Sequence, residues 1–98
     1  SEPVIKVDLP KAHTKEGEER DKITITLGKD GRMALDYKEY KTYEAMEPDL
    51  RDKLLMSESK LIILKADQDA LHGKLVDLMA KAKAAGARSL TVATERKE

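Results

Sequence analysis

The longest continuous apolar run of the chain, Leu61-Ile62-Ile63-Leu64, limits the possible folds more than any other feature. Four consecutive aliphatic residues, two of them β-branched, are typical of a central strand that is covered on both faces. A helical pattern flanks this run on each side. Because the chain has 98 residues, it has room for one packed core and not for two. The run therefore predicts an inner strand of a single domain that mixes strands and helices.

Two alternating segments predict a β-hairpin before this strand. In Ile23–Leu27, aliphatic residues alternate with threonines, and the alternation resumes over residues 33–37. A period of two residues is typical of a strand with one buried face. The connecting residues 28–31 end in Asp30-Gly31, a pair that accepts the positive φ of a tight turn. We therefore expect two antiparallel strands that share an aliphatic face.

A first helix is expected between the hairpin and the apolar run. Thr42 could cap a helix, but Pro48 would then lie inside it, lacking an N–H and clashing with a carbonyl. A start near Glu47, with Pro48 at the first helical position, is the easier interpretation. The helix is expected to end around residues 57–59. Its predicted buried stripe comprises Met46, Leu50, Leu54 and Leu55.

A second helix and a last strand follow the apolar run. Asp67 or Asp69 can cap this helix, and Gly86 ends it as a C-cap. Lys81 and Lys83 are interpreted as a solvated helix face. Residues 89–94 alternate again, with Leu90 and Val92 expected to point inward. The predicted stripe of the helix comprises Leu71, Leu75, Leu78, Met79 and Ala82.

These elements together predict an α+β fold, a mixed β-sheet with two helices packed on one face. The expected order is strand, linker, and then β-β-α-β-α-β. The strands at residues 61–64 and 89–94 should be parallel neighbours, because a helix joins them through a right-handed crossover. We expect residues 22–95 to form the domain and residues 96–98 to form a short tail.

Residues 1–21 are predicted to be a strand-forming arm followed by a polar linker. Residues 5–9 alternate strictly and Pro10 ends the strand, whereas residues 11–21 carry seven charges. As a flexible coil, this linker would span roughly 18 Å. A strand on such a linker suits capture at a sheet edge in a dimer or by a partner chain, although a disordered arm remains an alternative. The predicted partner-binding residues are Ile5, Val7, Asp8, Leu9 and Pro10.

Composition argues against several other functions. Lys plus Arg and Asp plus Glu number 19 each, and aromatic residues make up 3%, so we predict no nucleic-acid partner. No cysteine is present, and His13 and His72 have no spaced partner for a metal site. Helix capping explains Asp67 and Asp69 without chemistry, and the glycines form no phosphate-binding spacing. We therefore predict no catalytic, cofactor-binding or metal-binding residues, and no enzymatic activity.

Several motifs resemble the ExbD/TolR family in order and spacing. Residues 7–12, Val-Asp-Leu-Pro-Lys-Ala, are similar to the motif that follows the membrane helix in that family. The resemblance continues through residues 64–67, 73–79, 83–86 and 90–95. Residues 37–48, with three tyrosines and a proline, differ from the family pattern. This departure leaves the subfamily open.

The resemblance implies a periplasmic domain that pairs as a homodimer. Its partners would be an ExbB/TolQ-like channel subunit, which conducts protons, and a TonB/TolA-like transducer reaching the outer membrane. TolR-like relatives also suggest an alternative, a cell-wall anchor that binds peptidoglycan. Because the chain opens with Ser1, we expect it to be a piece of a longer protein, tethered to the inner membrane by an absent N-terminal helix. The proton-carrying Asp of the family lies in that helix, so Asp8 is not its counterpart.

Overall fold

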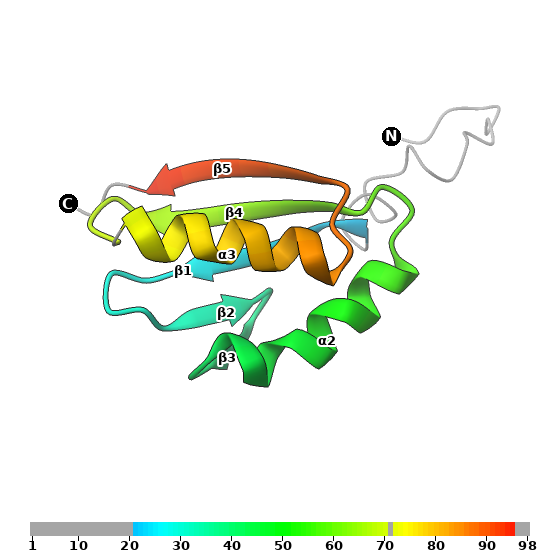
Figure 1. The fold of residues 1–98 in the computed structure, drawn as a ribbon, viewed down its shortest axis with the longest axis horizontal. Coiled ribbons are helices and arrows are strands. Elements are labelled where there is room, and N and C mark those ends of the chain that lie inside the picture. The colour runs from blue at the N-terminus through cyan, green and yellow to red at the C-terminus, as the bar shows by residue number, and fades with distance from the viewer. Residues whose placement is uncertain (1–20, 71, 96–98) are drawn as a thin grey trace, which may run out of the picture.

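A computed structural model describes residues 21–70 and 72–95. The strand predicted at residues 5–9, most of the linker and Leu71 therefore lie outside the described residues. Five strands and two helices follow one another along the chain (Figure 1). They are β1 (Ile23–Leu27), β2 (Met33–Leu35), β3 (Lys38–Tyr40), α2 (Tyr43–Met56), β4 (Leu61–Asp67), α3 (His72–Ala85) and β5 (Ser89–Glu95).

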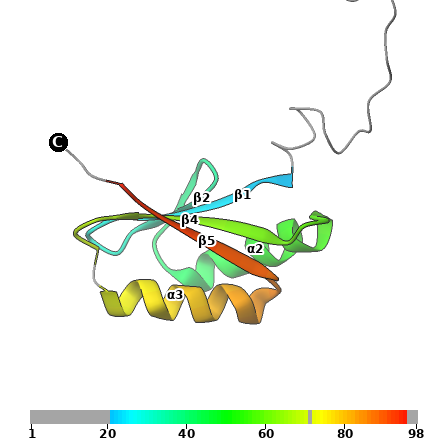
Figure 2. The same cartoon turned by 90° about the horizontal axis from the view of Figure 1, so that it is seen from above.

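The strands form one mixed sheet in the order β3-β2-β1-β4-β5. The pairs β1–β2 and β2–β3 are antiparallel, whereas β1–β4 and β4–β5 are parallel. Both helices lie on the same side of this sheet, as the view from above shows (Figure 2). The predicted α+β fold, with a mixed sheet and two helices on one face, is therefore confirmed.

The second alternating segment is not one continuous strand. β2 ends at Leu35, and Asp36 has a φ of 53°, which turns the chain back into β3. Asp36 is held there because its amide donates to the Thr24 carbonyl at 2.7 Å, while its Oδ1 accepts from the Thr24 amide at 3.0 Å. Tyr37, which the alternation placed in the strand, is fully exposed at the tip of this turn.

The core lies between the sheet and the helices and is almost entirely aliphatic. Adjacent strands align their buried residues in rows, so that Ile25 lies between Leu35 on β2 and Leu64 on β4. Tyr43 is the only aromatic residue among the buried side chains that the structure describes. The buried residues are Ile23, Ile25, Leu27, Leu35, Tyr43, Met46, Leu50, Leu54, Ile62, Leu64, Ala66, Leu78, Ala82 and Ala85.

β4 is an inner strand, as predicted, but helices cover only one of its faces. Ile62 and Leu64 point to the helices and are buried. Leu61 and Ile63 lie on the opposite face and are half-buried. The prediction of cover on both faces is wrong because α2 and α3 both pack on the same side. A continuous apolar run therefore does not by itself distinguish one-sided from two-sided cover.

α2 begins earlier than predicted. Thr42 is its N-cap, and the Oγ1 of this residue accepts from the Ala45 amide at 3.1 Å. The start expected near Glu47 is therefore wrong, and Pro48 is the sixth residue of the helix. An interior proline costs about 3 kcal/mol, and the cap and the burial of Tyr43 and Met46 in the first turns offset that cost.

The buried stripe of α2 is close to the prediction but differs at two positions. Met46, Leu50 and Leu54 are buried as expected. Leu55 is 78% exposed, so its predicted burial is wrong, and Tyr43 is buried instead. The earlier start explains the change, since Tyr43 then lies one turn before Met46 and two turns before Leu50 on the same helix face.

α3 follows the predicted pattern over most of its length. Leu78 and Ala82 are buried, and Leu75 and Met79 are partly buried against the core. Gly86 ends the helix with a φ of 129°, as predicted. The Asp67 Oδ1 accepts from the Asp69 amide at 2.8 Å in the loop before α3, whose predicted capping by Asp67 or Asp69 stays a prediction.

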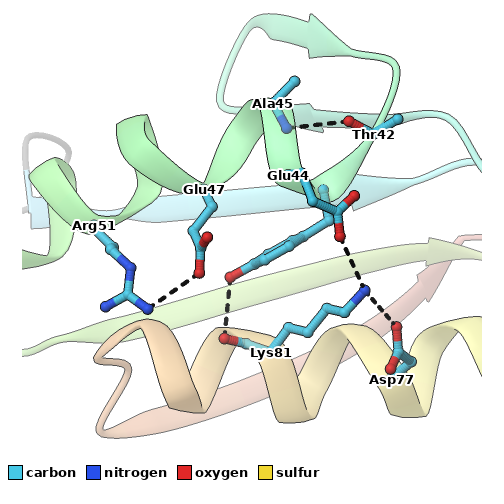
Figure 3. Close-up of polar contacts among 8 residues, drawn as sticks. Thr42, Glu44, Ala45, Glu47, Arg51, Asp77 and Lys81 are labelled. Carbon is cyan, nitrogen blue, oxygen red and sulfur yellow. Dashed lines mark hydrogen bonds and ion pairs between the residues drawn. The ribbon is translucent and has the colours of Figure 1, made fainter.

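Lys81 joins the two helices at the surface of the domain (Figure 3). Its Nζ is 3.0 Å from Asp77 on α3 and 3.7 Å from Glu44 on α2. The same ammonium lies 5.3 Å from the ring centroid of Tyr43, whose hydroxyl donates to the Lys81 carbonyl at 3.1 Å. The Lys81 side chain stays 38% exposed while it makes these contacts, and Lys83 is exposed.

Leu50 and Leu55 are a matched pair for testing the core. Leu50 is fully buried in α2 and Leu55 is exposed in the same helix. We expect Leu50→Ala to lower the free energy of unfolding by about 2–5 kcal/mol, because it leaves a cavity. Leu55→Ala should change it by no more than about 0.5 kcal/mol. Urea denaturation followed by circular dichroism measures both, and equal losses would contradict this assignment of the core.

Candidate partner-binding site

The residues predicted to bind partners, Ile5, Val7, Asp8, Leu9 and Pro10, lie outside the described residues. Their partner-binding role therefore stays a prediction. The structure does describe the base of the arm, because Asp21 is the first residue that it places.

Asp21 is held by a loop that is distant in the sequence. Its Oδ1 accepts from the Ser57 hydroxyl at 2.6 Å and from the Glu58 amide at 3.0 Å. Its Oδ2 accepts from the Ser59 hydroxyl at 2.6 Å. The hydrogen bond from Ser57, followed by that from Ser59, lowers the pKa of Asp21 below its ordinary value of 3.8. The stability that these bonds contribute is therefore fully present at pH values above the ordinary pKa of 3.8, and it is lost as the pH falls through the lowered pKa of Asp21.

β5 presents a long outer edge to solvent. It pairs with β4 over seven residues, and on its other side no strand of the described chain lies beside it. Residues 89–94 contain no charge and no proline, the features with which natural proteins usually protect such edges. Leu90 packs partly against the core as predicted, whereas Val92 points inward as predicted but is 40% exposed. Val92 shares the helix-facing side with Leu64, but β5 is the outermost strand of the sheet.

The arm base and the start of this edge lie at the same end of the sheet. Because β1, β4 and β5 are parallel, their first residues meet there (Figure 1). The contact between them runs through Lys60, whose amide donates to the Ser57 Oγ at 3.0 Å. The Lys60 carbonyl accepts from the Arg88 amide, just before β5, at 2.8 Å. An arm leaving at Asp21 thus starts close to the first residues of β5.

A second candidate surface is a shallow hollow between the β2–β3 turn and α2. It has a volume of about 520 Å³, and Tyr37 and Tyr40 line it together with Asp49. Tyr40 donates a short hydrogen bond to Asp49, which raises the pKa of Tyr40 to about 12 and lowers the pKa of Asp49. Sequence reasoning assigned no site here, although the cluster of three tyrosines in residues 37–48 was a visible signal.

Other site types find no support among residues 21–70 and 72–95. In that part of the chain, no three His, Cys, Asp or Glu side chains are grouped as metal ligands. None of its helices has the length and apolar character needed to cross a membrane. His72, one of the two imidazoles, is exposed at the start of α3.

Comparison with known families agrees with the motifs and the fold. Residues 1–97 match the family described as biopolymer transport protein ExbD/TolR. A search of curated proteins found no match. Proteins of the matched family act in biopolymer transport as energy transducers, are not known as enzymes, and carry a periplasmic domain anchored to the inner membrane. The match spans nearly the whole chain, including the arm motif, and confirms the resemblance noted from the sequence. The chain therefore belongs to the ExbD/TolR family.

Proposed function

We propose that this chain is the periplasmic part of an energy-transducing protein driven by the proton motive force. In this proposal it dimerises and couples an ExbB/TolQ-type proton channel in the inner membrane to a TonB/TolA-type partner. The outcome would be transport across the outer membrane or maintenance of its integrity. The observation that carries the proposal is the outer edge of β5, uncharged over residues 89–94, in a chain of this family.

Two copies of β5 can pair with each other across a two-fold axis. Antiparallel self-pairing is isologous, so each copy gives and receives the same backbone hydrogen bonds. The opposite edge of the sheet is β3, which has only three residues and carries Lys38 and Glu39. β5 is longer and, over residues 89–94, uncharged. The β5 edge therefore suits a second copy better than the β3 edge does.

The arm provides a separate partner-binding element in this proposal. Residues 1–21 act as a strand-forming arm with its linker, residues 22–95 as the domain, and residues 96–98 as a tail. A TonB/TolA-type partner or a neighbouring sheet edge captures residues 5–10 as an added strand. Backbone hydrogen bonds supply affinity, while Ile5, Val7 and Leu9 supply the apolar face. The arm thereby reports the state of the membrane channel to the partner.

A charge placed on the β5 edge tests the dimer. Ala93→Lys puts an ammonium on an exposed β5 residue, and a two-fold axis at the middle of β5 would bring two such groups together. We expect the dimer dissociation constant to rise about tenfold or more. Ala84→Lys, an exposed change of the same chemistry on α3, is the control and should leave the constant unchanged. Sedimentation equilibrium measures both, and equal behaviour of the two variants would refute pairing through β5.

Val7→Asp tests the arm. It places a charge on the apolar face of residues 5–9 and should weaken binding of a purified TonB- or TolA-like segment about tenfold. Thr14→Asp adds the same charge in the linker and serves as the matched control. Isothermal titration calorimetry gives both affinities. If the chain without residues 1–12 binds as tightly as the intact chain, the arm has no part in partner binding.

Peptidoglycan binding is a second candidate, favoured by the hollow between the β2–β3 turn and α2. Tyr37 is fully exposed there, and an exposed aromatic ring provides an apolar face on which a sugar can pack. If the hollow anchors the cell wall, purified sacculi should retain the protein, and Tyr37→Ala should release most of it. Leu55→Ala is the control, because it removes apolar surface from another exposed position of the domain. Absence of retention by sacculi would dispose of this candidate.

A further inference from the structure

The loop that holds Asp21 is braced by its own hydrogen bonds. The Ser57 amide donates to the Leu54 carbonyl at 3.2 Å, which closes the end of α2. The Lys60 Nζ donates to the Leu54 carbonyl at 2.8 Å and to the Ser57 carbonyl at 3.0 Å. Ser59 Oγ also accepts from the Leu61 amide at 3.3 Å, at the first residue of β4. The carboxylate of Asp21 is therefore fixed to a loop that is itself tied to α2 and β4.

The same loop continues to the start of β5. The carbonyl of Lys60 accepts from the amides of Arg88 and Ser89, at 2.8 Å and 3.4 Å. Lys60 has a φ of 51°, a left-handed conformation that a non-glycine residue adopts only where its surroundings hold it. A short path of hydrogen bonds thus runs from Asp21, through Ser57 and Lys60, to the first residue of β5.

These hydrogen bonds change how a pulling force on the arm is transmitted to the domain. The covalent chain leads from Asp21 directly into β1 at Ile23, where the strand first pairs with β4 at Ile62. Without the contacts of Asp21, a pull on residues 1–20 would act on the first ladder bonds of β1 alone. With these contacts, the loop that joins α2 to β4 shares the load.

We propose that Asp21 is a positioning residue that fixes the base of the arm to residues 57–59. The arm then leaves the domain beside the start of β5, and tension on it reaches the β5 edge through the loop as well as through β1. The inference rests on the proposed function, in which the arm and the β5 edge bind partners. It adds a physical connection between the arm and the β5 edge. That connection begins with the hydrogen bonds of Asp21 to Ser57 and Ser59, which lie 36 and 38 residues further along the chain.

A purely structural role for Asp21 is the competing explanation, and a distance measurement separates the two. The chain has no cysteine, so Glu18→Cys and Lys83→Cys introduce two spin labels at chosen sites. Glu18 lies three residues before Asp21, and Lys83 is exposed in the last turn of α3. Pulsed electron resonance on the 98-residue chain then reports how tightly the arm base is held. A change confined to stability would leave the distance distribution of the folded chain unaltered.

Asp21→Ala should at least double the width of this distance distribution. It should also weaken the binding of the purified TonB- or TolA-like segment, which depends on the arm, about fivefold or more. Asp30→Ala is the matched control, because Asp30 also accepts hydrogen bonds from a loop, from the amide and Nε of Arg32, at the far end of β1. It should change neither quantity. If Asp21→Ala proves too unstable, Ser59→Ala removes one of the three bonds from an exposed residue and should broaden the distribution partially.

Combination with Val7→Asp distinguishes failure of this inference from failure of the proposed function. If Val7→Asp alone leaves association unchanged, the arm does not bind partners and the proposed function fails. If Val7→Asp weakens association but Asp21→Ala leaves both association and distance distribution as in the parent chain, the positioning role is overturned. It is also overturned if Asp21→Ala weakens association by the same factor with and without Val7→Asp, because the effect then bypasses the arm.

Discussion

The aliphatic layer between β1, β4 and the two helices is the interaction on which the rest of the structure depends. Ile25 and Leu64 lie side by side at its centre, and Leu50 is buried above the sheet. Among the described residues, Tyr43 is the only buried aromatic side chain in this layer, and both helices that cover it lie on one side of the sheet. In the part of the chain that the structure describes, no helix covers the opposite sheet face and no strand pairs with the outer edge of β5. A domain this small buries only about 60–65% of its unfolded surface, so the edge pairing that we propose would add stability that the core does not provide.

The parallel arrangement of β1, β4 and β5 has a second consequence. Parallel strands begin at the same end of a sheet, so the chain before β1 necessarily leaves near the loops that precede β4 and β5. An antiparallel placement of β5 would have put its start at the far end. The topology itself therefore brings the arm base close to the edge that we propose for pairing. The contacts of Asp21 with residues 57–59 turn this proximity into a defined attachment.

Local patterns predicted the elements well where a single physical signal dominated. Alternation predicted β1, and Gly86 predicted the end of α3 because a positive φ favours glycine there. Prediction failed where two signals competed: Pro48 argued for a late start of α2, while the Thr42 cap and the burial of Tyr43 outweighed its cost. The turn at Asp36 was missed because it depends on bonds to Thr24, twelve residues away. The candidate site was even harder to predict, since the pairing of Asp21 with Ser57 has no signature in local sequence.

The same reasoning explains why the β5 edge is easier to predict from sequence than the attachment of Asp21 to residues 57–59. The open β5 edge follows from composition, because residues 89–94 carry neither charge nor proline, and only the strand order was needed to show that they lie outermost. The attachment needs three donors to converge on one carboxylate, a geometry that the fold creates by placing the end of α2 beside the start of β1. Serine and aspartate are common in loops, so their presence alone carries no such information. If the domain transmits motion as we propose, the informative contacts are those that join the ends of distant elements.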